Sequence, residues 1–566
     1  MEKFARMAEP VGQAIVYDVS RPRGFFGLSE EHFSRIHRKI NLAPLYRVFS
    51  QARRHHAKTV VIEELADSIE LFEENEDLKK LDCWHTKHRV RKVSFFKTSF
   101  SDTAAIDSLP PESFIGFAIW KEDFGTTPSS ACARVYEAVI PPPNERYLHV
   151  RGEPTWKCRV LGRVFEVKGY PFYQQNGVTN VCAHAAVRTL ASCYPNGPDT
   201  TYREMNVSLG LEDPDFRIIR GLDARQIETL VRKAGALCNR TDYCQQPRRP
   251  EVPYQRCVYG SIESGFPAII IFGKDDSAKK KKTRGKKKAA GKNEDYLHAI
   301  TVFGHTFNPD MWVPRVEAAR FDLGKTTGYI PSDFWLGSFL GHDDTLGSHY
   351  TIPRHYMRSM QPARNDHPSV KATEGVAHVI CSQPWMTKLT SVGAEAIALG
   401  WINEIFEEHH AVIPEPWGRR LHKQQSNRQL VLRSIFIEKS DYITHITGMR
   451  GWDSDKEVMD AGAIKQIDAD IKKDCFWMIE VSLQELFPTN RRKLGEVLVD
   501  PGYRNEEFSR EMFSQSKIAA RLPGAWISPG GSILEIPITS HSALLGCLDG
   551  ISEEYPKEHP AGSLQA

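Results

Sequence analysis

The sequence of 566 residues contains no apolar run long enough to cross a membrane as a helix. Its longest apolar stretches, such as Phe266–Phe272, have the length of a strand, whereas a membrane helix needs about 20 consecutive apolar residues. The first segment, Met1–Pro22, mixes acidic and basic side chains with its apolar residues, so it does not form the apolar core of a secretory signal. We therefore expect a cytoplasmic protein with no membrane partner.

The chain has 11 cysteines, but no two of them are spaced as C-x-x-C. Disulfide frameworks use closely spaced, even numbers of cysteines in short secreted chains, and structural zinc sites use C-x-x-C pairs. Neither kind of site is therefore expected. Most of these cysteines should be small buried side chains, which leaves room for one with a chemical role.

Three common catalytic motifs are also missing from the sequence. They are the phosphate-binding loop G-x-x-x-x-G-K-[ST], the zinc-protease motif H-E-x-x-H and the serine-hydrolase motif G-x-S-x-G. Nucleotide hydrolysis, zinc proteolysis and serine hydrolysis through these motifs are therefore not expected. We expect no metal and no other cofactor.

Positive charge is concentrated in one segment, although the net charge of the chain is only +3. Residues Lys274–Lys292 hold ten basic and two acidic side chains, a balance of +8, which leaves −5 for the rest. The simplest expectation for this insert is a solvated loop. The run Lys279–Lys288 could also bind an acidic protein or a nucleic acid, but it has no aromatic residues on which bases could stack.

The length of the chain predicts more than one domain, because single hydrophobic cores stop growing at roughly 250–300 residues. A first joint is predicted at Pro141–Asn144, where three prolines can continue neither a helix nor a strand. We expect an N-terminal accessory α/β domain over residues 1–150, a central domain over 151–361 and a C-terminal accessory α/β domain over 362–566. The lysine-rich insert, 274–292, would belong to the central domain.

The spacing of apolar residues indicates a mixture of helices and strands. A spacing near 3.6 predicts a helix, and short alternating or continuous β-branched runs predict strands. The predicted helices are Ala43–Arg54, Val60–Leu71, Cys182–Leu190, Asp223–Ala236 and Val392–Glu408. The predicted strands are Phe114–Trp120, Val135–Ile140, Arg159–Tyr170, Pro267–Phe272, His298–Gly304, Leu430–Ile437, Phe476–Val481 and Leu494–Val499.

The helix that begins at Cys182 has the features of a catalytic segment. Its apolar residues share one face, and Thr179 or Asn180 could cap its start. Cys182 would then lie in the first turn, where free N–H groups and the helix dipole favour a thiolate. This position makes Cys182 a candidate nucleophile.

Acyl transfer by a thiolate also needs a base that exchanges protons and a donor that stabilises the oxyanion. His298 and Gln175 are the candidates for these two roles. Along the chain come a glutamine-containing loop, the Cys182 helix, an apolar strand, a strand that starts with His298 and a strand that leads to Asp343. Each signal alone is weak, and their joint order is what points to one site.

This order resembles the papain-like fold of cysteine peptidases, especially the compact branch of bacteriocin-processing, double-glycine peptidases. The resemblance rests on a glutamine before Cys182 and on the segments Ile262–Ile270, His298–Gly304 and Phe339–Gly347, and it covers about residues 165–355. It implies an α+β core in which the cysteine-bearing helix packs on an antiparallel sheet.

The resemblance also implies a role for each residue. Cys182 would be the nucleophile and His298 the general acid/base, while Asp343 would orient the imidazole. Gln175 and the backbone N–H of Cys182 would form the oxyanion hole. The reaction would be attack on a carbonyl carbon, formation of a thioester, and release to water or another acceptor.

Two of these assignments have alternatives. Gln175 precedes the cysteine by seven residues, where the usual spacing in the family is about six, so one residue must bulge. Gln174 is an alternative oxyanion donor. Asp344 and Asn308 are alternatives to Asp343 as the residue that orients the imidazole.

The sequence thus predicts a papain-like thiol hydrolase, most simply a cytoplasmic cysteine peptidase that acts on a protein or peptide substrate. Deamidases, transamidases and isopeptidases use the same chemical groups, and a fold alone does not separate them from peptidases. A binding or regulatory module that kept the fold but lost turnover is the alternative from a different class.

Overall fold

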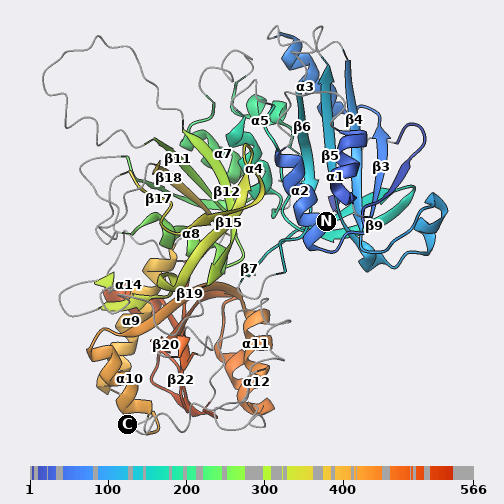
Figure 1. Ribbon diagram of the computed structural model, residues 1–566. Coiled ribbons are helices and arrows are strands. Elements are labelled where there is room, and N and C mark those ends of the chain that lie inside the picture. Colours follow the sequence, from blue (N-terminus) through green and yellow to red (C-terminus); the bar gives the residue numbers. More distant parts are fainter. Residues whose placement is uncertain are drawn as a thin grey trace, which may run out of the picture.

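The computed structural model describes residues 3–4, 10–21, 23–33, 43–80, 87–124, 132–144, 148–176, 181–194, 200–211, 221–244, 252–274, 297–307, 321–322, 328–360, 374–383, 389–408, 413–415, 417–448, 459–484, 486–487, 493–502 and 510–538. It is a mixed α+β protein with four sheets, most of whose strand pairs are antiparallel (Figure 1). Among the described residues, no helix has both the length and the apolar character needed to cross a membrane. The predicted α+β class is confirmed at this level.

An antiparallel five-stranded sheet, in the order β2-β3-β4-β5-β6, forms the N-terminal part of the molecule. Helices α1 and α2 pack on one face, through Leu28, Leu45 and Phe49. The elements are β2 Ile15–Asp18, α1 Gly24–His32, α2 Ala43–Arg54, β3 Thr59–Leu65, α3 Ile69–Lys80, β4 Lys87–Phe96, η1 Thr103–Ser108, η2 Pro111–Ser113, β5 Phe114–Phe124 and β6 Cys132–Val139.

Two sequence-based predictions in this part have opposite outcomes. The helix Ala43–Arg54 is confirmed as α2, but the predicted helix Val60–Leu71 is wrong. Its first half is β3, in which six of seven residues are buried, and α3 begins only at Ile69. A strand covered on both faces is apolar throughout, so the spacing of its apolar residues does not distinguish it from a helix. The β-branched residues Val60–Ile62 favour the strand.

A three-stranded sheet, β1-β8-β9, covers the other face of the N-terminal sheet. Trp156, Phe165 and Val167 pack there against Phe96 and Phe117. The predicted strand Arg159–Tyr170 is instead a hairpin, because Leu161 and Gly162 both have positive φ angles, of 50° and 88°, and such a pair makes a tight two-residue turn. The strands are β1 Lys3–Phe4, β8 Thr155–Val160 and β9 Arg163–Lys168.

The central sheet has the order β10-β18-β11-β12-β15-β16, and all neighbours along this path are antiparallel. β17 also pairs with β18, and β7 with β12. The strands are β7 Leu148–Val150, β10 Leu237–Asp242, β11 Ala268–Lys274, β12 His298–Phe307, β15 Leu336–Asp343, β16 Gly347–Pro353, β17 Met357–Ser359 and β18 Glu374–Gln383, with η6 Ser332–Trp335 before β15.

Helices cover both faces of the central sheet (Figure 1). On one face, α4 and α7 pack against β11 and β12, and the apolar face predicted for α4, with Ala183 and Leu190, lies in this core. Asp223 caps α7 together with Gln226 in a capping box, as its sequence suggests. On the other face lies α8. The helices are α4 Cys182–Ala191, α5 Tyr202–Ser208, α7 Ala224–Lys233 and α8 Tyr254–Glu263.

A third large sheet, in the order β13-β14-β19-β20-β21-β22-β23-β24, forms the C-terminal part and lies below the central sheet in Figure 1. Helices α9 and α10 share a core with one face, and α11 and α12 with the other. The elements are β13 Phe321–Asp322, β14 Gly328–Pro331, α9 Ser391–Glu408, α10 Trp417–Ser426, β19 Leu430–Glu438, α11 Lys439–Thr447, α12 Ala461–Asp470, β20 Cys475–Leu483, β21 Gly495–Val499, α14 Arg510–Gln515, β22 Lys517–Leu522, β23 Ala525–Ile527 and β24 Ile533–Glu535.

The sheets do not divide the chain at residues 150 and 361. β8 and β9 follow residue 150 but pack on the N-terminal sheet, and β18 follows residue 361 but is an inner strand of the central sheet. Strand order alone does not define domains, so the predicted bounds at 150 and 361 stay predictions. The lysine-rich insert lies outside the described residues apart from the end of β11.

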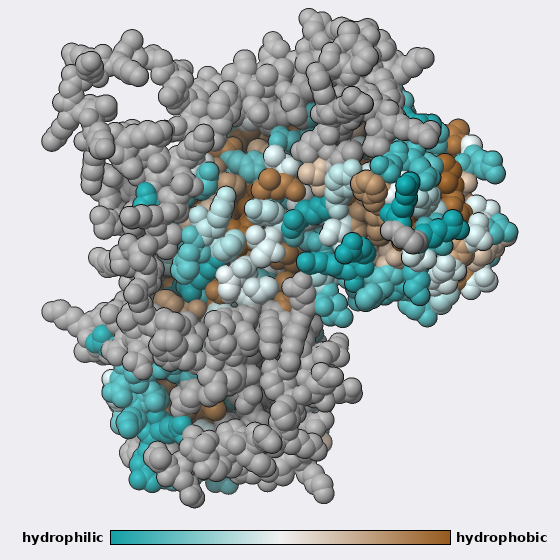
Figure 2. All heavy atoms as spheres, viewed as in Figure 1, coloured by the Kyte–Doolittle hydropathy of each residue, from teal (hydrophilic) through white to brown (hydrophobic). Residues whose placement is uncertain are grey.

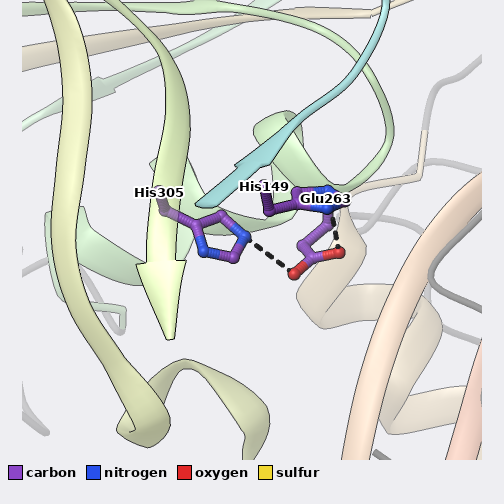
Figure 3. Close-up of side chains that lie close together, drawn as sticks. All are labelled: His149, Glu263 and His305. Carbon is purple, nitrogen blue, oxygen red and sulfur yellow. Dashed lines mark hydrogen bonds and ion pairs between the residues drawn. The ribbon is translucent and has the colours of Figure 1, made fainter. Parts of the chain in front are cut away.

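A buried ion-pair network joins the central sheet to the C-terminal sheet. Figure 3 shows its start, where the Glu263 carboxylate at the end of α8 faces His305 of β12 and His149 of β7. His305 Nε2 lies 2.8 Å from Glu263 Oε1, and Arg433 of β19 donates to Oε2 at 2.9 Å. Arg433 also donates to Glu480 at 2.9 Å. The two buried carboxylates thus share the positive charge of Arg433.

Candidate active site

Cys182 is the first residue of α4, and its side chain is partly exposed. The N-cap is Val181, which gives no side-chain cap; the predicted caps, Thr179 and Asn180, lie outside the described residues. The apolar residues that follow anchor the helix on the central sheet. The fold therefore holds the sulfur at the positive end of a buried helix, where an anion is favoured.

His298 begins β12 and reaches the sulfur of Cys182. Pairing with Phe272 of β11 fixes its backbone, and the Phe272 ring lies edge-on to the imidazole at 5.5 Å. The imidazole lies close enough to Cys182 for the sulfur to act on its pKa. Two residues that are 116 positions apart in the chain therefore meet at one site.

Two carboxylates from the end of β15 face the same imidazole. His298 Nε2 lies 3.5 Å from Asp343 Oδ2 and 3.3 Å from Asp344 Oδ1. These are ion-pair distances, and Nε2 is not aligned as a hydrogen-bond donor to either oxygen. Catalytic hydrogen bonds are often long before a ligand binds, so the geometry is that of a loosely assembled cysteine, histidine and aspartate set.

The surroundings of His298 favour its charged form. Burial opposes the charge, but the contacts with Asp343 and Cys182 and the charge of Asp344 outweigh burial and raise the pKa of His298 to about 11. At neutral pH the ring is therefore an imidazolium, which can pair with a thiolate and later give up its proton.

The two aspartates differ in what surrounds them. Asp343 Oδ1 accepts the backbone N–H groups of Thr345 and Leu346 at 2.9 and 2.8 Å, which turns Oδ2 towards His298. Burial alone would raise the pKa of Asp343, but His298 and these N–H groups hold it below its ordinary value. For Asp344 burial dominates over the attraction of His298 and raises its pKa to about 7. Asp343 is thus the carboxylate that stays charged.

This difference predicts opposite effects of two substitutions on stability. The pKa of Asp344 rises from 3.8 to about 7 on folding, so stability falls as pH rises from about 4 to about 7, by up to about 4 kcal/mol at about 1.4 kcal/mol per unit, and stays at that lower level above pH 7. Asp344→Asn should therefore raise the urea midpoint at pH 8 relative to the wild type, and much less at pH 5.

Asp343→Asn is the matched comparison. Its lowered pKa means that the charged form of Asp343 stabilises the fold at every pH above its unfolded value. The asparagine variant should therefore have a lower urea midpoint at pH 8. Shifts of the same sign for both variants at pH 8 would contradict this description of the pair.

The two glutamines of the preceding loop turn in different directions. Gln174 pairs with β6, since its N–H donates to Val135 O at 3.0 Å and its Oε1 accepts from Val135 N at 2.9 Å. Gln175 instead donates from Nε2 to Thr345 Oγ1 at 3.0 Å, two residues after Asp343. This placement favours Gln175 over Gln174 as the oxyanion donor. Asn308 lies outside the described residues.

The histidine next to the aspartates has a structural role. His342 Nε2 lies 3.0 Å from Tyr170 O, and its Nδ1 accepts the backbone N–H of His349 at 3.0 Å. Burial lowers the pKa of His342 to about 4. The ring is therefore a neutral bridge inside the sheet.

Sequence reasoning missed a contact from the N-terminal sheet to this site. Arg47 of α2 donates from Nε to Ser348 O at 2.5 Å and from Nη2 to His349 O at 2.6 Å. Gly347 permits this approach, since a Cβ there would lie 2.9 Å from Arg47 Cδ. The turn that carries Asp343 is thus held by hydrogen bonds from a residue about 300 positions away. The sequence contains no local pattern that predicts this contact.

An apolar pocket of about 260 Å³ lies beside His298. Phe272, Ile300 and Tyr350 are among its walls, and Leu346 and Tyr356 at its lining are 47% and 49% exposed. Figure 2 shows hydrophobic side chains at the surface over the central sheet. The pocket is large enough for one apolar side chain of a substrate and adjoins the reacting groups.

Three sets of described side chains have the ligand types and spacing to hold a metal ion. They are His298 with Asp343 and Asp344, the buried trio His149, Glu263 and His305, and a partly exposed trio of Asp242, Cys244 and His378. In the buried trio, Arg433 already donates a hydrogen bond to the Glu263 carboxylate. The positive charge of Arg433 disfavours a metal cation at this place.

Comparison of the chain with protein-family models, with curated proteins and with solved structures finds no match. The function is therefore inferred from the side chains that the fold brings together.

Proposed function

We propose that this protein is a papain-like thiol hydrolase, most simply a cytoplasmic cysteine peptidase. One observation carries the proposal: the cysteine that heads a buried helix lies beside a histidine whose Nε2 faces two carboxylates. A thiol at a helix N-terminus beside an imidazolium is the arrangement that activates sulfur as a nucleophile.

The proposed reaction has two steps. The Cys182 thiolate attacks the carbonyl carbon of an amide, and His298 gives its proton to the leaving amine as the C–N bond breaks, which leaves a thioester. His298, now neutral, takes a proton from water as that water attacks the thioester, and the carboxylic acid and Cys182 are released. Asp343 holds the ring in place and stabilises its charged form.

Gln175 and the backbone at Cys182 supply the hydrogen bonds to the developing oxyanion. In the structure the Gln175 amide donates to Thr345, so this N–H would move from a hydroxyl to the substrate oxygen on binding. Oxyanion donors of this kind contribute about 10²–10³ to the rate.

The pocket beside His298 supports a peptide substrate. Its walls are mainly apolar and aromatic, with Glu374 as a charged lining residue. An apolar or aromatic side chain near the scissile bond fits this lining, because its burial contributes roughly 25 cal/mol per Å².

An activated ester of N-acetylphenylalanine tests the proposal, since a nucleophilic cysteine would take up the acyl group. Intact-mass and peptide mapping should place the acyl group on Cys182, with none there in Cys182→Ser. Cys193→Ser is the matched control, because Cys193 is also partly exposed and lies just beyond the same helix. Acylation elsewhere in the wild type would overturn the assignment of the nucleophile.

The two neighbouring glutamines provide a second readout of the same experiment. Gln175→Ala should slow acylation of Cys182 by about 10²-fold, and Gln174→Ala should leave the rate near that of the wild type. The reverse pattern would reassign the oxyanion donor. A protein that takes up no acyl group would instead be the binding module that kept the fold without turnover.

A further inference from the structure

Three side chains with metal-binding chemistry meet at strands β10 and β18 of the central sheet. Asp242 is the last residue of β10, Cys244 follows it by two positions, and His378 lies on β18. One ligand atom from each residue lies within 4.8 Å of the other two. The proposed hydrolase reaction uses none of these side chains.

Strand pairing brings the three residues together. Asp242 and His378 are direct partners in the antiparallel pair of β10 and β18, so their side chains leave the same face of the sheet. The backbone N–H of Cys244 donates to Asp242 Oδ1 at 2.8 Å, which turns the chain after β10. This turn keeps Cys244 beside the carboxylate.

The distances in this trio are close to those of a zinc site. Asp242 Oδ1 lies 3.7 Å from His378 Nδ1. Bonds of about 2.0–2.3 Å to a tetrahedral zinc ion place its ligand atoms about 3.3–3.6 Å apart. Cys244 is exposed, so rotation of its side chain can bring the sulfur to the same separation, and an ion can enter from the surface.

The neighbouring positive charge approaches the far side of the carboxylate. Arg240 Nη1 lies 3.5 Å from Asp242 Oδ2, and its Nε lies 3.1 Å from Glu228. Oδ1 is the oxygen that faces His378. The buried trio differs, because there Arg433 donates strongly to Glu263 from two of its nitrogens. A cation is therefore better tolerated beside Asp242.

The donor atoms favour zinc over magnesium or calcium. Burial lowers the pKa of His378 below its ordinary value, although Asp242 acts in the opposite direction, so the ring keeps a lone pair for a metal ion at neutral pH. Met360 Sδ lies 3.6 Å from Cys244 Sγ. Sulfur and imidazole are zinc ligands, whereas magnesium and calcium take oxygen ligands.

We propose that Asp242, Cys244 and His378 bind a zinc ion whose fourth position is open to water or another ligand. Carboxylate oxygen, thiolate sulfur and imidazole nitrogen are all established zinc donors, and three protein ligands with one open position is a common set. The Cys244 thiol gives its proton to solvent as the zinc–sulfur bond forms. Because the ligands come from two strands, the ion fastens the end of β10 to β18. Binding does not depend on the proposed hydrolase function.

Titration with cobalt(II), which takes the place of zinc, tests the proposal in the Cys182→Ser protein. This background removes the thiol beside the other partly exposed trio, His298 with Asp343 and Asp344. We expect the near-ultraviolet absorption of a thiolate bound to cobalt, and we expect zinc to abolish it. A second substitution, Cys244→Ser, should remove the absorption.

His378→Ala in the same background keeps the thiol and removes one other ligand. The cobalt concentration that gives half of the absorption should rise by at least about 10-fold, since even changes beside a metal ligand cost about 10–100-fold in affinity. An unchanged concentration would exclude His378 as a ligand and overturn the proposal.

Cys475→Ser is the matched control. Cys475 is also partly exposed, and burial together with nearby carboxylates raises its pKa, but it belongs to none of the three described metal-type trios. Its replacement should leave the absorption unchanged, and excess magnesium should not displace cobalt. No absorption in Cys182→Ser, absorption that persists without Cys244, or displacement by copper(I) but not by zinc would each overturn the proposal.

Discussion

Replacing His298 with alanine is expected to lower the rate of acyl transfer to Cys182 by about 10²–10⁴. This is the usual contribution of a positioned acid/base, and here the ring also supplies the positive charge that balances a thiolate. The pKa of about 11 for His298 means that this charge is present throughout the neutral range. The acylation rate of Cys182 with the phenylalanine ester measures the effect.

His378→Ala is the control for this substitution. His378 lies on β18 of the same sheet, where it pairs with Ile271 of β11, and it is partly exposed. Its Nδ1 lies 3.7 Å from Asp242 Oδ1. Its removal should leave the acylation rate within about twofold of the wild type, while a similar fall in both variants would point to a general disturbance of the sheet.

Replacing Arg433 with methionine is expected to destabilise the protein by about 3–5 kcal/mol, because it leaves the buried carboxylate of Glu263 without its arginine partner. Arg433 is 1% exposed and donates to both Glu263 and Glu480. Burial would raise the pKa of Glu263, but Arg433 and the two nearby histidines hold it well below its ordinary value. Methionine keeps much of the volume and loses all of the charge. Urea unfolding at pH 7 measures the change.

Arg419→Met provides the comparison for Arg433. Arg419 also forms an ion pair with a glutamate, Glu415, at 2.7 Å, but its side chain is 81% exposed. Exposed pairs of this kind contribute little to stability, so no measurable shift of the unfolding midpoint is expected. Equal effects of the two substitutions would show that the buried junction between the sheets does not depend on Arg433.

The sequence predicted the core elements of the site because each has a local signal. The helix from Cys182 shows apolar spacing, β11 is a continuous apolar run, and β12 begins at His298. Their order along the chain was enough to expect that Cys182 and His298 meet. The helix prediction for Val60–Leu71 was wrong because its first half is a strand buried on both faces. Such a strand is apolar at nearly every position, so the spacing of its apolar residues does not distinguish it from a helix.

Other features of the site depend on contacts that local patterns do not encode. Asp343 and Asp344 are neighbours of the same type, and their charge states differ because His298 and two backbone N–H groups lower the pKa of Asp343, whereas burial dominates at Asp344. The choice between the glutamines depends on pairing of Gln174 with Val135 of the N-terminal sheet. The hydrogen bonds from Arg47 to the start of β16 join segments about 300 residues apart. The last two come from contacts with the N-terminal part of the chain.

The rate at which iodoacetamide alkylates Cys182 at pH 6 tests the pairing of sulfur with imidazolium most directly. An ordinary thiol has a pKa near 8.5 and is almost fully protonated at pH 6, so it reacts slowly. We expect Cys182 of the wild type to react faster than Cys182 of His298→Ala, because a neighbouring imidazolium favours the thiolate, and faster than Cys193 of either protein. Equal rates for Cys182 with and without the imidazole would contradict the account.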